Sequence, residues 1–177
     1  NVKAGNVKSI LTPGDVVFEV RRTKAGGPHT SPEPDEIRGD GKLAMDGNIH
    51  SKHFNAGQDA DGGNPRGVNT GLVITPRPNH APVTAIQFAT ANDMVDRDPL
   101  AVTVEGADNA DGPYTLIYRG SSGLLKTLER GQWGGVAVFE NTRACKVYRV
   151  LVTETRGDNA DAVQFGEVRL GTYTGER

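Results

Sequence analysis

Short apolar runs, each ended by glycine, proline, asparagine or aspartate, are the feature that most restricts what this chain can fold into. Val83–Thr90 is the longest clean run, and Leu100–Glu105 alternates between apolar and polar residues before Gly106 ends it. Such alternation is typical of strands, and no segment shows the 3.6-residue periodicity of a long amphipathic helix. The predicted strands cover residues 16–21, 71–75, 83–90, 100–105, 114–118, 136–139, 147–152 and 163–170.

The glycines and prolines between these runs predict an all-β fold in one domain. The chain has 177 residues, of which 23 are glycine and 10 are proline. A chain of this length buries enough apolar surface to fold as one domain without disulfides. Many short strands joined by turns indicate a sandwich or a barrel. Two longer polar segments, residues 23–40 and 57–69, are expected to be loops of the kind that carry function.

Composition argues against several classes of partner. The net charge is −2 with acids and bases mixed, whereas nucleic-acid-binding domains usually carry a basic stripe. No apolar run approaches the roughly 18 residues of a membrane span. Cys145 is the single cysteine, so neither an intramolecular disulfide nor a cysteine-based zinc site is expected. The chain begins Asn-Val-Lys, which we interpret as a piece of a larger protein.

Three segments carry a resemblance to one family. Residues 43–55 read LAMDGNIHSKHFN, residues 90–106 contain TAND, RDP and VTVEG in that order, and residues 163–170 read VQFGEVRL. In order and spacing they resemble the signature segments of the discoidin-like domains, the group that includes the coagulation factor V/VIII type C domains. The second segment is similar to that of a bacterial subset of this group, the carbohydrate-binding modules.

The resemblance implies a fold and a setting. The fold would be an antiparallel β-sandwich of the jelly-roll, galactose-binding-domain-like type. It would form a single domain over residues 1–177, with its core at about residues 14–172. The parent would be a bacterial protein that is secreted or displayed at the cell surface. Catalytic or surface domains would be attached to this one, and the domain itself is expected to be a monomer.

The same resemblance implies a structural calcium ion. Its ligands would be the backbone oxygens of Leu43, Asn48 and Gly166, the side chains of Asp46 and Glu167, and both oxygens of Ser51. Calcium prefers six to eight hard oxygens, often mixing carboxylates with backbone carbonyls. A turn through Asp46-Gly47-Asn48 can curl carbonyls inward because glycine tolerates unusual dihedrals. The alternative is that this segment is only a turn and that Glu167 is an exposed strand carboxylate.

A sugar site is expected in the loops at one end of the sandwich. The candidates implied by the resemblance are Arg97 and Asn92, with Lys52 and His53 from the neighbouring loop. Arginine offers a rigid fork of donors that suits paired hydroxyls or a sugar carboxylate. Trp133, the only tryptophan, lies among glycines, and an exposed tryptophan is a natural platform for a sugar ring.

Several of these residues have an alternative role. Arg97 lies between Asp96 and Asp98, so it could form an ion pair that holds the loop. His53 is interpreted as a loop histidine, and Phe54 is expected to pack inward. Trp133 could fold down over the end of the sandwich.

The sequence therefore predicts a non-catalytic carbohydrate-binding module that binds an oligo- or polysaccharide through its end loops and is stabilised by calcium. The alternative is a calcium-stabilised structural or adhesion domain without a glycan site. No Gly-x-Ser-x-Gly elbow and no phosphate-binding glycine loop occurs, so catalysis is not expected. The abundance of acids keeps a glycan-active enzyme as a third hypothesis.

Overall fold

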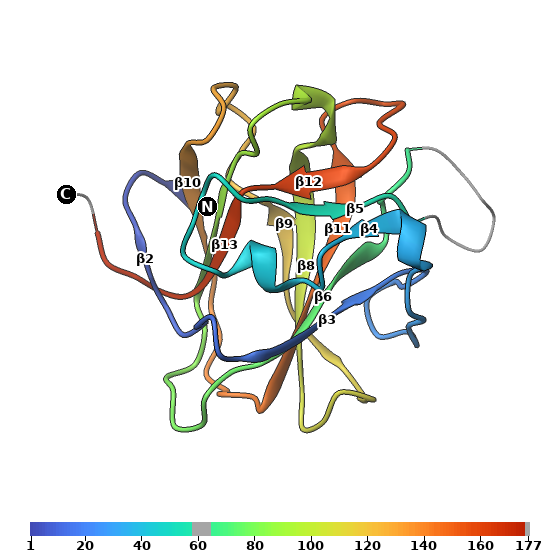
Figure 1. Ribbon diagram of the computed structural model, residues 1–177. Helices are drawn as coiled ribbons and strands as arrows, with labels where there is room; N and C mark the ends of the chain where they lie inside the picture. The colour runs from blue at the N-terminus through green and yellow to red at the C-terminus, as the bar shows by residue number, and fades with distance from the viewer. Residues whose placement is uncertain (58–64, 176–177) are drawn as a thin grey trace.

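A computed structural model describes residues 1–57 and 65–175 as two five-stranded antiparallel sheets packed face to face, with a small third sheet beside them (Figure 1). The first sheet has the order β1-β10-β7-β13-β2, and the second has the order β3-β6-β11-β8-β9. The small sheet has the order β12-β5-β4. This confirms the predicted all-β jelly-roll sandwich. None of the described helices is long and apolar enough to cross a membrane.

The elements are short, as the turn-rich sequence requires. The first sheet consists of β1 (Val2–Lys3), β10 (Trp133–Val138), β7 (Ala85–Ala89), β13 (Glu167–Tyr173) and β2 (Val7–Ser9). The second consists of β3 (Val16–Val20), β6 (Thr70–Thr75), β11 (Val147–Thr155), β8 (Pro99–Ala107) and β9 (Thr115–Ser121). The small sheet consists of β12 (Val163–Phe165), β5 (His53–Asn55) and β4 (Ile37–Arg38). Three 3-10 turns complete the described part: η1 (Pro34–Glu36), η2 (Lys42–Ala44) and η3 (Val95–Arg97).

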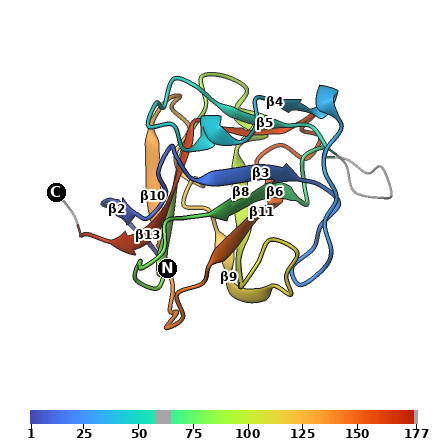
Figure 2. The same ribbon diagram turned by 60° about the horizontal axis from the view of Figure 1, so that its bottom comes forward.

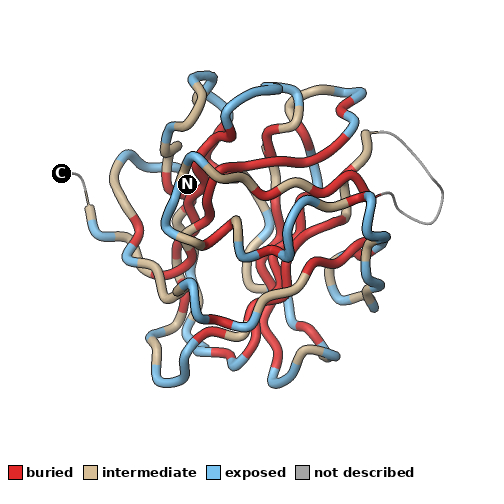
Figure 3. Tube along the Cα trace, viewed as in Figure 1, coloured by how far each residue is buried: buried red, intermediate tan, exposed pale blue. Residues whose placement is uncertain are grey.

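The main core lies between the two large sheets, which Figure 2 separates. Figure 3 shows buried residues along the central strands and exposed residues in the loops at both ends. Phe88 and Ile86 of the first sheet, and Leu72 and Tyr148 of the second, belong to this core and are almost completely inaccessible. Burying such side chains stabilises the fold by roughly 1.5–3 kcal/mol each. The apolar runs of the sequence therefore form this core.

Every predicted strand is present, with one difference. The run 163–170 is divided at Gly166 into β12 and β13. A Cβ atom at Gly166 would lie 2.8 Å from the carbonyl oxygen of Thr90 and 2.9 Å from that of Ile49. Two other segments press against the chain here, so the strand changes sheets at a residue without a side chain.

The loops of the sandwich lie at two opposite ends. The antiparallel register pairs Tyr148 with Ile74, and Thr155 with Pro99, so the loops alternate between the ends. One end carries the loops around residues 91–98, 122–132 and 156–162, which we call the Arg97 end. The other carries the loops around residues 76–84, 108–114 and 139–146, which we call the Cys145 end (Figure 1). The predicted loop over 57–69 lies partly outside the described residues.

Candidate functional site

The predicted calcium loop forms a cluster of oxygen atoms around Ser51. Its hydroxyl group lies 2.6 Å from Oδ2 of Asp46, 2.8 Å from the carbonyl oxygen of Asn48 and 3.3 Å from that of Leu43. One hydroxyl proton cannot serve three acceptors at once. The carbonyl oxygen of Asn48 also accepts the backbone N–H of Ser51 at 3.2 Å, so the segment gathers several oxygen acceptors around one hydroxyl group.

Glu167 approaches this cluster from the last strand. Its Oε1 accepts a hydrogen bond from the backbone N–H of Asp46 at 3.1 Å, and the residue is only 5% exposed. Burial, together with the neighbouring Asp46 carboxylate, raises the pKa of Glu167 to about 8. Burial alone would raise the pKa of Asp46, but hydrogen bonds from Glu167, Ser51 and the backbone of Asn48 outweigh it and lower that pKa. Two acidic groups from distant parts of the sequence thus meet at one point.

The local sequence explains why the loop takes this shape. Gly47 has φ near 80°, a left-handed conformation that glycine adopts without strain. The backbone N–H of Asn48 donates to Oδ1 of Asp46, and that of His50 donates to Oδ1 of Asn48, each at 2.9 Å. These two Asx turns wind the chain around the cluster. Gly166 supports it by leaving room for the carbonyl group of Ile49.

The oxygen set suits a hard cation of the calcium class rather than zinc. Over residues 1–57 and 65–175, no group of three or more histidine, cysteine, aspartate or glutamate side chains is arranged to hold a metal. The cluster contains two carboxylates, and its other oxygens come from Ser51 and the backbone. Calcium accepts such a mixture, whereas zinc prefers nitrogen and sulfur.

Arg97 lies at the end of η3 in a network with β12 and the loop that precedes it. Its guanidinium group binds both carboxylate oxygens of Asp161, at 2.7 and 3.0 Å, and lies 3.3 Å from Oε1 of Gln164. It also lies 5.2 Å from the centre of the Phe54 ring. The hydrogen bond with Arg97 lowers the pKa of Asp161, and the same bond raises the pKa of Arg97. The predicted loop-holding ion pair exists, but its partner is Asp161 rather than Asp96 or Asp98.

Asp98 instead holds the loops of the Arg97 end together. It is completely buried. Its carboxylate accepts hydrogen bonds from both terminal nitrogens of Arg130 at 2.7 Å and from Nε of Arg156 at 3.1 Å. Two cations therefore share one buried carboxylate, which fixes the frame on which Arg97 is placed.

Lys52 joins the same surface through Asp93. Its ammonium group lies 2.9 Å from Oδ1 of Asp93, and the side-chain amide of the buried Gln164 donates to the same oxygen at 2.8 Å. These bonds lower the pKa of Asp93. Asn92 is exposed beside them. The structure thus brings Arg97, Lys52 and Asn92 to one surface, as predicted, and joins the first two through Gln164 and Asp93.

Two predictions in this region are wrong. His53 is a buried strand residue, 1% exposed, with Nδ1 2.9 Å from Oε1 of Glu19 and its ring stacked on Phe165 at 4.5 Å. It is therefore not accessible to a ligand. Phe54, which was expected to pack inward, is half-buried on the opposite face of β5. The alternation of side chains along a strand explains both corrections.

Phe54 is consequently the aromatic residue of this surface. Arg38 lies over its ring at 4.9 Å and Arg97 at 5.2 Å. Sequence reasoning did not assign a binding role to Arg38, Asp93, Asp161 or Phe54. The period-two pattern of residues 53–55 was the available signal for Phe54, whereas the pairing of Arg97 with Asp161 depends on tertiary structure.

Trp133 lies elsewhere. It begins β10 rather than lying in a loop, is half-buried, and has the guanidinium group of Arg169 3.6 Å from its ring centre. It borders a hollow of about 220 Å³ whose wall includes Gly47, Ile49 and Glu167. The structure therefore places Trp133 beside the oxygen cluster.

The sandwich and its sheet order define a class: this chain has the discoidin-like, galactose-binding-domain-like fold of carbohydrate-binding modules. Among solved structures, CpGH89CBM32-5 from Clostridium perfringens, in complex with GalNAc-β-1,3-galactose, has a TM-score of 0.60 at 10% identity. That match covers 92% of this chain and 99% of the other. The family 32 module of Clostridium perfringens NanJ, in complex with galactose, has a TM-score of 0.55 at 13% identity. That match covers 88% of this chain and 92% of the other.

A longer structure shows the same fold beside other domains. It contains the CBM32-1, CBM32-2 and M60 catalytic domains of Clostridium perfringens ZmpB, with a TM-score of 0.54 at 14% identity. The match covers 98% of this chain and 15% of that one. No protein-family model and no curated protein matches the chain.

Proposed function

We propose that this chain is a non-catalytic carbohydrate-binding module that binds an oligo- or polysaccharide at the Arg97 end. The observation that carries the proposal is the surface around Phe54. A half-exposed aromatic ring lies beneath two arginines, with the carboxylates of Asp93 and Asp161 exposed beside it. The fold is that of modules solved with sugars, which supports the same conclusion.

The chemistry of this surface suits a sugar. An aromatic ring packs against the C–H face of a pyranose, while carboxylates and guanidinium groups bind pairs of hydroxyls. Gln164 and Asp98 are buried supports that fix Arg97 and the neighbouring loops before any ligand arrives. Such preorganisation lowers the entropic cost of binding.

The first ligands to test are galactose and GalNAc-terminated saccharides, because the similar structures were solved with galactose and with GalNAc-β-1,3-galactose. The role of the module would be to hold an attached domain near its polysaccharide. We further propose that the domain acts as a monomer within a secreted or cell-surface bacterial protein. The arrangement in ZmpB, where such modules accompany a catalytic domain, supports this setting.

We also propose a structural calcium ion in the oxygen cluster. Leu43, Asp46, Asn48, Ser51, Gly166 and Glu167 would hold it through the oxygens predicted from the sequence. The oxygen acceptors around Ser51, and the approach of the buried Glu167 to the half-buried Asp46, support this assignment. The ion would balance the two carboxylates and connect the loop before β5 to β13.

A titration of galactose followed by NMR tests the sugar site. Substitution of Arg97 by alanine should weaken binding by about tenfold, because one charged hydrogen-bonding group is lost. Arg119→Ala, which removes an exposed arginine from β9, is the matched control and should leave the affinity unchanged. Shifts should map to residues 52–54 and 92–97. Equal affinities of the two variants for galactose would show that Arg97 is not part of the sugar site.

One observation favours the alternative of a calcium-stabilised structural or adhesion domain. Arg97 and Lys52 are already engaged by Asp161 and Asp93, so a ligand must share or displace those partners. Under the alternative, these ion pairs only hold the loops together. Absence of binding to any glycan, with calcium present and the fold intact, would support it.

A further inference from the structure

A second hollow lies at the Cys145 end, away from the proposed sugar site. It has a volume of about 590 Å³, within the usual range for small-ligand sites. The loop after β6 forms one wall and the segment before β11 forms the other. The lining residues are Thr75, Pro76, Arg77, Pro78, Asn79, His80, Ala144, Cys145 and Lys146.

The walls of this hollow are held in place by hydrogen bonds. The ring nitrogens of His80 lie 2.8 Å from the carbonyl oxygen of Ala81 and 3.0 Å from that of Cys145, so the ring connects the two walls. The backbone N–H of Cys145 donates to the hydroxyl of Tyr148 at 2.9 Å. The side-chain amide of Asn141 donates to the carbonyl of Val83 at 3.0 Å. The hollow is therefore built by the fold rather than by mobile side chains.

The charge of the hollow has one sign. Arg77 and Lys146 are exposed on opposite walls, and neither has an ion pair with any residue in the described part of the chain. No aspartate or glutamate lines the hollow. Two cations without a partner, facing one space, create a positive potential that attracts anions.

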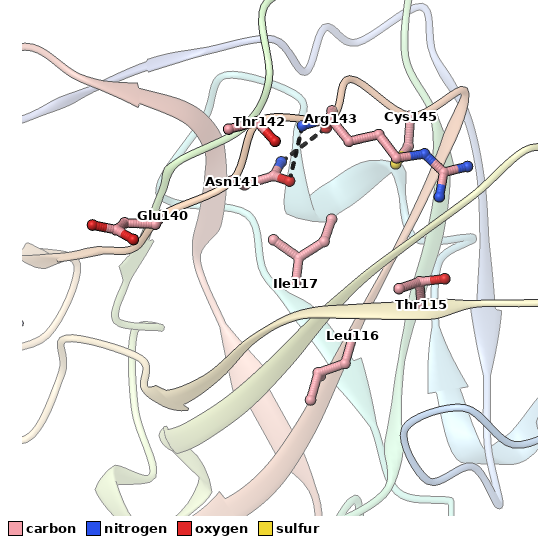
Figure 4. A pocket seen from close by; sticks show the side chains of 8 residues that line it. All are labelled: Thr115, Leu116, Ile117, Glu140, Asn141, Thr142, Arg143 and Cys145. Carbon is pink, nitrogen blue, oxygen red and sulfur yellow. Dashed lines mark hydrogen bonds between the residues drawn. The ribbon is translucent and has the colours of Figure 1, made fainter.

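The neighbouring hollow does not share this excess of positive charge. Figure 4 shows that hollow, on the other side of Cys145, with a volume of about 360 Å³. It contains Glu140, and its only cation, Arg143, lies 3.2 Å from Oδ1 of Asp108. Its charges are therefore balanced, unlike those of the hollow with Arg77 and Lys146.

We propose that the hollow lined by Arg77 and Lys146 is a second glycan subsite that binds a sugar with an anionic group, a carboxylate or a sulfate ester. Arg77 binds the anionic group through its planar fork, and Lys146 provides a point charge from the other wall. The exposed Pro78 presents an apolar ring face to the sugar, and Thr75 and Asn79 provide partners for its hydroxyls. The subsite extends the proposed function, and it does not depend on Arg97.

Isothermal titration of the intact chain tests this proposal. The probes are a galacturonate oligosaccharide, its methyl-esterified counterpart of the same length, and galactose 6-sulfate. We expect the galacturonate or the sulfate ester to bind at least tenfold more tightly than the uncharged methyl ester. Comparison of the two anionic probes shows which anionic group is preferred. The double variant Arg77→Gln/Lys146→Gln should weaken binding of the anionic probe about tenfold or more. The charge-matched double control Arg119→Gln/Lys8→Gln, at exposed residues of β9 and β2, should bind as the original chain does.

The proposal would be overturned by no binding of either anionic probe, by equal binding of the methyl ester, or by equal loss of binding in both double variants. Amide shifts should appear at residues 75–80 and 144–146, and shifts confined to residues 92–97 would also overturn it. Neutral galactose, titrated separately with Arg97→Ala, reports on the proposed site at the Arg97 end. Failure of one proposal is therefore distinguishable from failure of the other.

Discussion

At the residue scale, the calcium proposal depends on Ser51, Asp46 and Glu167. Three oxygens of other residues lie within 3.3 Å of the Ser51 hydroxyl oxygen. Glu167 adds a second carboxylate from a strand far along the sequence. Their convergence without a facing cation in the described residues distinguishes this loop from an ordinary turn. The sequence motif predicted the participants, and the structure shows that the first and third segments meet.

Removing the ion should therefore destabilise the fold. With calcium at a hundred times its Kd, a chelator removes about 2.7 kcal/mol of stability, and this lowers the Tm by roughly 5–10 °C in a domain of this size. Asp46→Ala should produce the same loss and remove the response to the chelator, measured by differential scanning calorimetry. Asp158→Ala, at an exposed aspartate, should keep the original stability and the response to the chelator. A Tm indifferent to the chelator and to Asp46→Ala would contradict the calcium site.

The pair of Arg97 and Asp161 makes a second residue-scale prediction. Arg97 lowers the pKa of Asp161 below its ordinary value, so the pair is intact above that value and is lost as the pH falls through the lowered pKa. In Arg97→Ala the pKa of Asp161 should rise toward 3.8, as followed by carboxyl-carbon NMR. The same measurement on Arg119→Ala should show no change. An unaltered pKa in Arg97→Ala would mean that the ion pair is absent in solution.

At the element scale, a buried ion pair fixes a loop to the outer face of the second sheet. Arg149 on β11 and Glu105 on β8 are both inaccessible and form two hydrogen bonds, at 2.9 and 2.8 Å. The same groups bind the backbone of the loop: Glu105 accepts the N–H of Gly26 at 2.7 Å, and Arg149 donates to the carbonyl of Gly27 at 2.9 Å. The predicted long loop over 23–40 is anchored here by two strands.

Breaking this pair should be costly. Glu105→Gln leaves the Arg149 charge buried without its counterion, and such changes cost about 3–5 kcal/mol. Urea denaturation measures the loss. Asp108→Asn, which breaks the exposed pair with Arg143, is the control and should cost less than about 1 kcal/mol. Similar losses of unfolding free energy in the two variants would show that the buried pair stabilises the fold no more than the exposed pair does.

The sequence predicted the long strands well and the short ones poorly. Val147–Val152 and Leu100–Glu105 carry enough β-branched residues to be recognised, and both extend further in the structure. The strands β1, β2, β4 and β5 have two or three residues each, too few for periodicity to show. The alternation of residues 53–55 shows that His53 and Phe54 face opposite ways, but which of them faces inward, and the partner of Arg97, depend on tertiary contacts that a single sequence does not show.

At the scale of the whole molecule, the two proposed glycan sites lie at opposite ends of the sandwich. The Arg97 end carries Phe54 and the surrounding charged residues, while the Cys145 end carries the cationic hollow. The oxygen cluster joins the loop before β5 to β13 and so stabilises the frame for both.

A glycan array probed with the purified chain in the presence of calcium tests the central claim most directly. The account predicts retention on galactose- or GalNAc-terminated glycans, and loss of that retention in Arg97→Ala but not in Arg119→Ala. A folded, calcium-saturated chain that is retained on no glycan would contradict the account and would leave a structural or adhesive domain in its place.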